Sequence, residues 1–466
     1  MNSGNHLTSQ HMKINQSKYE TELHILGGGP AGLAAAYYAK NQGLDFKLIE
    51  GGRNLGGNCR TLRLGDCLFD TGAHRFHDKD PEITQLVKKL LGDDLLRVSA
   101  PSHIFHQDRF FQFPLTLSNL VRKLDPKTLF KIAVENIGFR DSRSSAQITN
   151  FAEFAHYHYG QTLSEKFLLN YSQKLWGLDA NLLSPVISGG RLNGLNLKHF
   201  IQESLLGQGE SPKHLDGTFF YPRYGFGMIV DKLAESIGQL NIQTSCRITR
   251  LLHSNRRIEN VVINNNKTLP VSQVISTLPL TLTVQMLEPE PPIELLSIAR
   301  SIQFRHLILV VFCLNSSSFS DNASIYFPEP KFPFTRLYEP KNRSKKMAPD
   351  EQTAIVLELP CYNDEAVWQM PDSSLQDQVW KALQNVKLID PSKILQQKTF
   401  KLPFAYPVLT TGFEAKVTQL IEYCQKFENL HLTGRNALFR YLHLHDLFKL
   451  GQLSVEKVIK SSNAIC

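Results

Sequence analysis

The stretch that decides the fold runs from Glu22 to Glu50 and begins Glu-Leu-His-Ile-Leu-Gly-Gly-Gly-Pro-Ala-Gly. The short apolar run Leu23–Leu26 predicts a buried strand, and the alanine-rich segment Leu33–Lys40 predicts a helix. Phe46–Ile49 is apolar again and predicts a second strand, parallel to the first. A strand, a glycine turn, a helix and a strand in this order indicate an α/β domain built on a parallel sheet.

The glycines of this turn lie where a bound dinucleotide needs them. Gly27 permits the tight turn, Gly29 lets a pyrophosphate approach the backbone, and Gly32 lets the helix pack on the strand. The helix N-terminus then faces the phosphates with its positive dipole end. Glu50 lies 23 residues beyond Gly27, where a carboxylate can accept protons from two ribose hydroxyls. The pattern predicts a Rossmann-type dinucleotide site, and an ordinary glycine turn is the alternative.

The residues after Glu50 favour a flavin over a nicotinamide. Gly56-Gly57 and then 70–77 resemble the FAD-binding start of the flavoproteins that include amine oxidases, protoporphyrinogen oxidases and UDP-galactopyranose mutases. In that class the paired glycines pass the phosphates, and the later segment borders the isoalloxazine. The resemblance implies that FAD is bound by Gly27, Gly29, Pro30, Ala31, Gly32, Glu50, Gly51, Arg53, Gly56, Gly57, Asn58, His74, Arg75, Phe76, Gly434 and Arg435.

The composition is that of a globular protein with ordinary cores. The 466 residues allow two or three domains, and no apolar run is long enough to span a bilayer. Residues 1–20 are polar and resemble neither a signal nor a transit peptide, so we expect a disordered tail and a cytoplasmic protein. The seven cysteines are scattered without a C-x-x-C pair, which indicates reduced thiols.

The net charge of +8 bears on the kind of partner. The basic residues are spread along the chain, apart from Lys341–Lys346, whereas a nucleic-acid-binding protein usually concentrates them in a patch. An anionic small substrate and loose attachment to the inner face of a membrane both stay open. Several histidines lie two or three residues apart, but no cysteine pair or acid completes a metal site, and we expect no metal.

The order of predicted helices and strands along the chain indicates three domains. The first of them is discontinuous in sequence. We expect a FAD-binding domain at 21–114, 216–292 and 405–466, a helical insertion at 115–215, and an antiparallel-sheet substrate domain at 293–404. Helical periodicity dominates the insertion, whereas Ile302–Leu314 and Thr353–Leu359 are strongly apolar and predict strands of the antiparallel sheet.

Several later segments sharpen the resemblance, in chain order, to UDP-galactopyranose mutase. These segments are His74–His77, Arg109–Pro114, Phe167–Gly177, Arg191-Leu192, Phe334–Glu339, Ala405–Val408, and Gly434-Arg435 with Arg440-Tyr441. The resemblance implies catalytic roles for His77, Arg336, Arg435, Tyr406 and Tyr441. It implies substrate binding by Phe167, Tyr171, Trp176, Arg191, Arg336 and Tyr406.

These residues also have physical interpretations of their own. Phe167 and Tyr171 are four residues apart on a predicted helix, so they either stack on a base or pack in a core. Arg191, Arg336 and Arg435 suit a pyrophosphate, since a guanidinium pairs with two phosphate oxygens, but a single arginine is more often in a surface ion pair.

The sequence departs from the mutase motifs at two places, and both bear on which reaction is predicted. Ser276–Leu280 resembles the oxidases, and His443 and His445 replace the family's acidic pair. The leading hypothesis is still a flavoenzyme that interconverts ring forms of a nucleotide-linked sugar through N5 of reduced FAD, with NAD(P)H as an external reductant. The resemblance places such an enzyme in cell-surface polysaccharide biosynthesis. The alternatives are a FAD-dependent oxidoreductase of the amine oxidase or protoporphyrinogen oxidase type and a flavin-binding scaffold without turnover. A homo-oligomer stays open.

Overall fold

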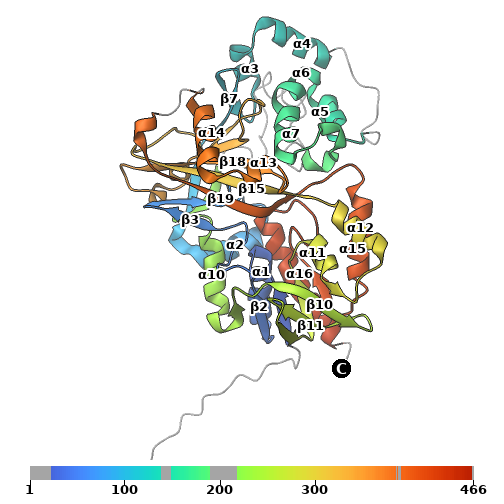
Figure 1. Ribbon diagram of the computed structural model, residues 1–466. Coiled ribbons are helices and arrows are strands. Elements are labelled where there is room, and N and C mark those ends of the chain that lie inside the picture. The colour runs from blue at the N-terminus through green and yellow to red at the C-terminus, as the bar shows by residue number, and fades with distance from the viewer. Residues whose placement is uncertain (1–21, 138–147, 189–217, 385, 387–389, 464–466) are drawn as a thin grey trace, which may run out of the picture.

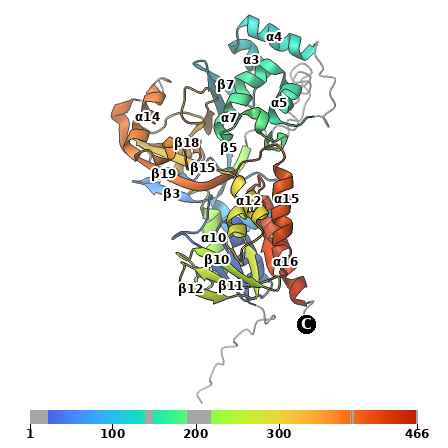
Figure 2. The same cartoon turned by 45° about the vertical axis from the view of Figure 1, so that its right-hand side comes forward.

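The computed structural model describes residues 22–137, 148–188, 218–384, 386 and 390–463. The expected tail at 1–20 and the candidate residue Arg191 lie outside these residues. Three groups of elements stack along the long axis of the molecule, with helices at one end, a large sheet in the middle and a parallel sheet at the other end (Figures 1 and 2). The expected α/β class is confirmed.

The parallel sheet has the strand order β20-β13-β1-β2-β9. Its strands are β1 (Leu23–Leu26), β2 (Phe46–Ile49), β9 (Ile242–Gln243), β13 (Gln273–Ser276) and β20 (Leu430–Leu432). The central strand β1 pairs in parallel with β2 and with β13, although 250 residues of chain separate Leu23 from Gln273. The sheet is therefore assembled from segments far apart in the sequence.

Helix α1 (Pro30–Asn41) follows β1 through the glycine turn. Gly29 is its N-cap residue and Pro30 begins it, where a missing backbone N–H costs no hydrogen bond. The small side chains of Ala34–Ala36 are fully buried, so α16 (Leu444–Asn463) approaches closely, and a Cβ at Gly451 would lie 2.9 Å from the nitrogen of Ala35. Helix α10 (Met228–Ile237) also packs on α1.

The middle layer is a seven-stranded sheet with the order β19-β15-β18-β17-β16-β6-β7. Its strands are β6 (Ser102–His106), β7 (Arg109–Phe113), β15 (Phe304–Leu314), β16 (Ser324–Tyr326), β17 (Arg336–Tyr338), β18 (Thr353–Cys361) and β19 (Ile394–Pro407). The eleven residues of β15 are all buried because separate apolar clusters cover its two faces. This burial explains the unbroken apolar run. The pairs are antiparallel except β16 with β6.

The helices of the insertion rest on the β6–β7 hairpin, which the sequence groups with the cofactor-binding segments. They are α3 (Leu117–Lys123), α4 (Pro126–Ile137), α5 (Phe151–Tyr159), α6 (Gln161–Leu163) and α7 (Asn170–Trp176), with a π-helical turn at Ser164–Leu169. Leu120 and Leu163 pack with Ile104 and Phe111 of the hairpin. Lys174 of α7 donates three hydrogen bonds to carbonyl oxygens of the segment between β16 and β17. These contacts hold α7 over the large sheet.

The remaining elements surround the parallel sheet and the outer face of the large sheet. A second sheet has the order β12-β11-β10-β14, and the pairs β3–β4 and β5–β8 stand alone. Their bounds are β3 (Thr61–Leu64), β4 (Cys67–Asp70), β5 (Leu95–Ser99), β8 (Thr218–Pro222), β10 (Ile248–Ser254), β11 (Arg257–Ile263), β12 (Lys267–Pro270) and β14 (Leu287–Glu288). The other helices are α2 (Pro81–Leu91), α11 (Leu280–Gln285), α12 (Ile293–Ser301), α13 (Ala366–Gln369), α14 (Asp372–Gln384) and α15 (Phe413–Cys424). No helix in the described part of the chain has the length and apolar character needed to cross a membrane.

Candidate active site

A cavity of about 540 Å³, here called the cofactor cavity, lies over the glycine turn between β1 and α1. The sequence predicts many of the residues that line it. These are Gly27, Gly29, Pro30, Ala31, Glu50, Gly57, Asn58, His74, Arg75, His77, Gly434 and Arg435. They come from segments at both ends of the chain, which the parallel sheet brings together.

The glycine turn leaves its backbone open to a ligand. Gly27 has φ +102°, and a Cβ at Gly32 would lie 1.9 Å from the carbonyl oxygen of Gly27, so neither position accepts a side chain without strain. Gly29 is different, since its φ is −76° and the nearest atom to an added Cβ is 3.9 Å away. Nothing in the fold requires glycine at Gly29, and a ligand that approaches its backbone supplies the reason.

The carboxylate of Glu50 closes the turn. Its two oxygens accept backbone hydrogen bonds from Gly28 at 2.7 Å and from Gly52 at 2.6 Å. Each carboxylate oxygen has a further lone pair, so two ribose hydroxyls can still donate to it. The structure thus places Glu50 where a dinucleotide needs an acceptor, at the end of β2.

A neutral histidine forms another wall of the cofactor cavity. Burial lowers the pKa of His74 to about 3, so the ring is uncharged at neutral pH. Its Nε2 lies 2.8 Å from the carbonyl oxygen of Asn58 and donates to it, since a carbonyl only accepts. The ring stacks on Phe226 with centroids 4.9 Å apart. His74 therefore offers a fixed, uncharged surface to the cofactor.

Five residues predicted to bind FAD are not among those that line the cavity, namely Gly32, Gly51, Arg53, Gly56 and Phe76. Phe76 is 1% exposed and packs in the core beneath the parallel sheet, because its backbone bridges to Phe220 and turns the ring inward. Arg53 is exposed, and Gly51 packs beside Arg247 on the outer side of the turn. The binding of FAD by Phe76 and Arg53 that the resemblance implies stays a prediction. Periodicity shows which residues are apolar but not which face meets a ligand.

Arg435 offers the clearest sign that this cavity holds an anionic or carbonyl-bearing group. Its guanidinium lies 4.5 Å from the ring centre of Tyr441 and 5.0 Å from that of Tyr406. Its Nε and Nη2 are buried and have no hydrogen-bond partner among the described residues. Unpaired buried donors are costly, and a flavin carbonyl or a phosphate oxygen would satisfy them. The residues present fit a flavin dinucleotide.

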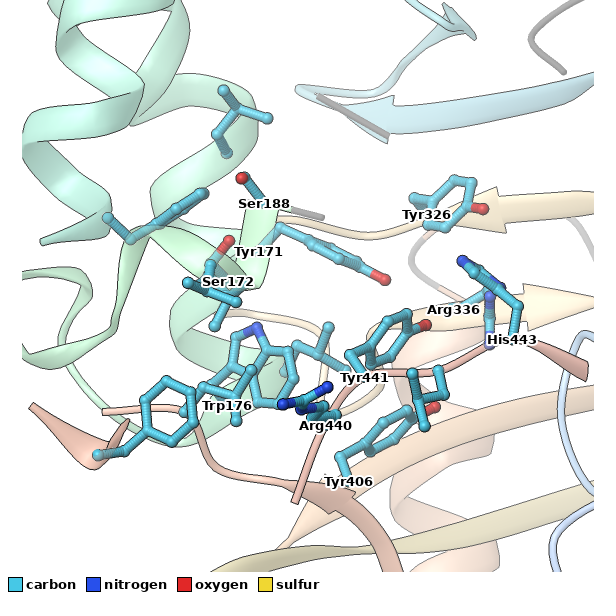
Figure 3. A pocket seen from close by; sticks show the side chains of 18 of the residues that line it. Tyr171, Ser172, Trp176, Ser188, Tyr326, Arg336, Tyr406, Arg440, Tyr441 and His443 are labelled. Atoms are coloured by element: carbon cyan, nitrogen blue, oxygen red, sulfur yellow. The ribbon is translucent and has the colours of Figure 1, made fainter. Parts of the chain in front are cut away.

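A second cavity of about 790 Å³, here called the substrate cavity, adjoins the first between the helices of the insertion and the large sheet. Nine residues line both cavities and form a shared wall, namely Lys79, Phe113, Pro114, Tyr326, Arg336, Tyr406, Tyr441, Leu442 and His443. Figure 3 shows Tyr171, Tyr326, Tyr406 and Tyr441 around the space beside Arg336 and His443. A cofactor and a substrate would meet at this wall.

Arg336 is held at the wall by Glu358. Arg336 Nε donates to Glu358 Oε2 at 2.9 Å and Nη2 donates to Oε1 at 2.8 Å. The two residues lie opposite each other on β17 and β18, and Glu358 is 2% exposed. One edge of the guanidinium is thus occupied by Glu358. The edge formed by Nη1 and Nη2 is left to pair with a substrate anion.

Aromatic side chains line the rest of the polar part of the substrate cavity. Tyr171 meets Tyr326 edge to face at 5.8 Å, and Trp176 meets Tyr406 at 6.1 Å. Burial raises the pKa of Tyr171 and of Tyr406, so both hydroxyls stay protonated and can donate. Four of the predicted substrate residues, Tyr171, Trp176, Arg336 and Tyr406, therefore line one cavity.

Phe167 also lines this cavity, and the sequence leaves open whether it stacks on a base or packs in a core. It is 4% exposed and packs on Phe111 and His106, each with ring centres 5.1 Å away. The core-packing alternative describes it better, because the β6–β7 hairpin lies directly under the helix that carries it.

Sequence reasoning missed Tyr326 and Glu358 and assigned no role to His443. Glu358 carried a usable signal, since it is the one charged residue in the buried strand β18. Tyr326 has no such signal in its short strand. Among the described residues, no group of three His, Cys, Asp or Glu side chains is arranged to hold a metal ion.

The glycine turn and the two adjoining cavities suit an enzyme that uses a dinucleotide cofactor. The family model for flavin-containing amine oxidoreductases matches residues 30–437. The chain belongs to this family, and it is a flavoenzyme.

Named relatives differ in their reactions. The structure of reduced UDP-galactopyranose mutase aligns with a TM-score of 0.81 at 18% identity, covering 94% of this chain and 96% of that one. A candidate protoporphyrinogen oxidase from Exiguobacterium sp. 255-15 aligns with a TM-score of 0.76 at 18% identity, covering 94% and 98%. Protoporphyrinogen oxidase 2 of Arabidopsis thaliana is 27% identical over 151 residues, which span 29% of each chain. These likenesses support the fold and leave the reaction open.

Proposed function

We propose that this protein interconverts ring forms of a nucleotide-linked sugar with its flavin, as FAD, in the reduced state. The observation that carries the proposal is the shared wall, where Arg336 stands among Tyr326, Tyr406 and Tyr441. A cation surrounded by hydroxyl groups suits an anionic substrate that carries many hydroxyls of its own.

The charges at the wall argue against an amine substrate. Lys79 and Arg336 line both cavities. Two of the acids that line the substrate cavity are already paired, Glu358 with Arg336 and Asp446 with His445, and the third, Glu414, accepts a hydrogen bond from Ser184. A protonated amine would meet net positive charge here, whereas a diphosphate would be attracted.

Each group of the site has a task in the proposed reaction. The bound reduced flavin supplies a nucleophilic nitrogen, N5, to the anomeric carbon of the sugar. The free edge of Arg336 holds a phosphate of the nucleotide, and Tyr171 and Trp176 offer ring faces to the base. The hydroxyls of Tyr406 and Tyr441 hold the sugar and the phosphate. NAD(P)H is the proposed external reductant, in the cytoplasm, and the product would enter cell-surface polysaccharide.

A second candidate is an oxidation of an apolar substrate such as a tetrapyrrole. It is favoured by the far part of the substrate cavity, which is lined by Phe151, Leu163, Leu409, Phe413 and Val417. An oxidase would use that part for the body of its substrate and Arg336 for a carboxylate.

Incubation of the reduced protein with a panel of nucleotide-linked sugars tests the proposal. Chromatography of each mixture should show a second ring form with one or a few sugars. If none of the sugars changes its ring form and an apolar substrate reduces the flavin, the oxidase of the second candidate would be favoured.

A further inference from the structure

His443 occupies a place that no assigned role explains. It is the residue before α16, and its side chain lines both the cofactor cavity and the substrate cavity. Figure 3 shows it beside Arg336, with Tyr171 on the opposite side of the space. Its ring meets Tyr441 edge to face, with centroids 5.7 Å apart. The imidazole thus stands at the wall where the two cavities adjoin.

The other members of the shared wall are poorly suited to move protons near neutral pH. Arginine stays protonated, and lysine and tyrosine side chains ordinarily titrate near pH 10. Burial raises the pKa of Tyr406 further. Among the described residues that line both cavities, His443 is the one imidazole. An imidazole is the side chain whose ordinary pKa allows it both to give and to take a proton under physiological conditions.

The first turn of α16 fixes the position of His443. Asp446 Oδ2 accepts the backbone N–H of His443 at 2.8 Å, an arrangement that caps the helix. Asp446 Oδ1 lies 3.3 Å from His445 Nε2. The ring of His445 stacks on that of His443 at 5.7 Å with an interplanar angle of 13°. One carboxylate therefore positions the backbone of His443 and the ring that supports its imidazole.

We propose that His443 carries the proton of the ring-opening and ring-closing steps, and that Asp446 and His445 are its positioning residues. This inference rests on the proposed function. Ring opening breaks the bond between the anomeric carbon and the ring oxygen. The bonding electron pair stays on that oxygen, which takes a proton from the His443 imidazolium. A bound reduced flavin would supply the electron pair that the carbon needs. Closure through a different hydroxyl forms a new carbon–oxygen bond and returns the proton to His443, so no proton or electron is consumed.

The charged surroundings of His443 shape its pH dependence. Arg336 on β17 and Lys79 before α2 line the same wall and disfavour the imidazolium. Asp446 favours it, and hydrogen bonding to His445 and to His443 lowers the pKa of Asp446 although burial opposes this. Burial raises the pKa of Tyr406, which therefore stays a neutral donor near His443. A substitution that removes the imidazole of His443 should therefore remove one titration step from the pH–rate profile of ring interconversion.

The test compares bond cleavage with ring interconversion in His443→Gln and in the wild type. The substrate is a nucleotide-linked sugar labelled with ¹⁸O in the bond between the anomeric carbon and the phosphate. Migration of the label to non-bridging phosphate positions reports cleavage of that bond and needs no proton from His443. We expect label migration within about threefold of the wild type, and ring interconversion slower by about 10²-fold or more, since general acid–base catalysis contributes about 10²–10⁴-fold. The pH–rate profile of interconversion should lose one limb.

Asp446→Asn is the matched variant, because an amide oxygen still accepts the backbone N–H of His443 while the charge that orients His445 is lost. It should shift the pH–rate profile of interconversion and leave label migration unchanged. Equal interconversion rates and profiles in His443→Gln and the wild type would overturn the inference. Equal loss of both readouts in His443→Gln and His443→Asn, with intact flavin spectra, would also overturn it and leave His443 a binding residue. Absence of label migration in the wild type would overturn the proposed function itself, and this inference with it.

Discussion

The guanidinium of Arg336 and the carboxylate of Glu358 form two parallel hydrogen bonds across β17 and β18, at 2.9 and 2.8 Å. Burial tends to lower the pKa of Arg336, but Glu358 and the nearby tyrosines raise it well above its ordinary value. A permanent cation is thus fixed at the wall between the two cavities. Its placement depends on a strand register that brings together residues 22 positions apart.

Arg336→Lys should weaken the binding of nucleotide-linked sugars without changing the flavin spectrum. An ammonium cannot bond Glu358 through one edge and a phosphate through another. Loss of one charge-assisted hydrogen bond, worth about 1.5–3 kcal/mol, predicts roughly a 10- to 100-fold weaker affinity. Calorimetric titration with a nucleoside diphosphate measures it. Glu358→Gln serves as the comparison. If Arg336 only supports the fold, both variants should lose stability while nucleotide affinity stays at the wild-type value.

Gly29→Ala should fold normally and bind FAD poorly. The backbone of Gly29 has φ −76°, which alanine adopts freely, and an added Cβ meets no protein atom closer than 3.9 Å. The methyl group would instead lie in the cofactor cavity, against the pyrophosphate. Flavin content after purification and the apparent dissociation constant on reconstitution check this result. Gly32→Ala is the control, since its Cβ would lie 1.9 Å from the Gly27 carbonyl oxygen and should damage the fold itself. Full flavin content in Gly29→Ala would place the cofactor elsewhere.

The lowered pKa of His74 predicts that the folded protein loses stability in mild acid. Its pKa is about 3 in the folded protein and about 6.5 in an unfolded chain, so the unfolded state binds more protons between these values. Stability therefore falls as the pH falls through this window, by about 2 kcal/mol between pH 7.5 and pH 5 from this residue alone. His74→Gln keeps a donor for the Asn58 carbonyl and does not titrate. Urea unfolding of both proteins with FAD in excess, at each pH, should show a smaller loss in the variant. Equal losses would mean that folding does not lower the pKa of His74.

Local patterns predicted the elements whose structure is decided within a few residues. Pro30, the surrounding glycines and the flanking apolar runs defined β1, α1 and β2, and the apolar run of β15 defined a strand covered on both faces. The start of helix α16 at Leu444 could not be predicted in this way. The polar and histidine-rich start of that helix masks its period, and Asp446 caps it through a contact that spacing alone does not reveal.

The site was predictable where a motif fixes the backbone and less so where partners meet across the fold. Gly27, Gly29 and Glu50 follow from spacing alone, and they line the cofactor cavity. The partner of Arg336 could not be read from the sequence, because it depends on the register of β17 with β18. Phe76 is buried in the core because its backbone forms a β-bridge with Phe220. This contact cannot be predicted from the local sequence. The roles of the residues in the substrate cavity stay predictions.

The central claim is that the flavin must be reduced but is not consumed. The most direct measurement reduces the protein once with dithionite, removes the excess reductant without oxygen, and adds the nucleotide-linked sugar. Interconverted sugar and flavin oxidation state are then followed together. The account predicts many turnovers per flavin with the flavin still reduced and no matching uptake of oxygen or reductant. Product formed only from oxidised flavin, with one flavin reduction or one oxygen consumed for each molecule, would contradict it and make the protein an oxidase.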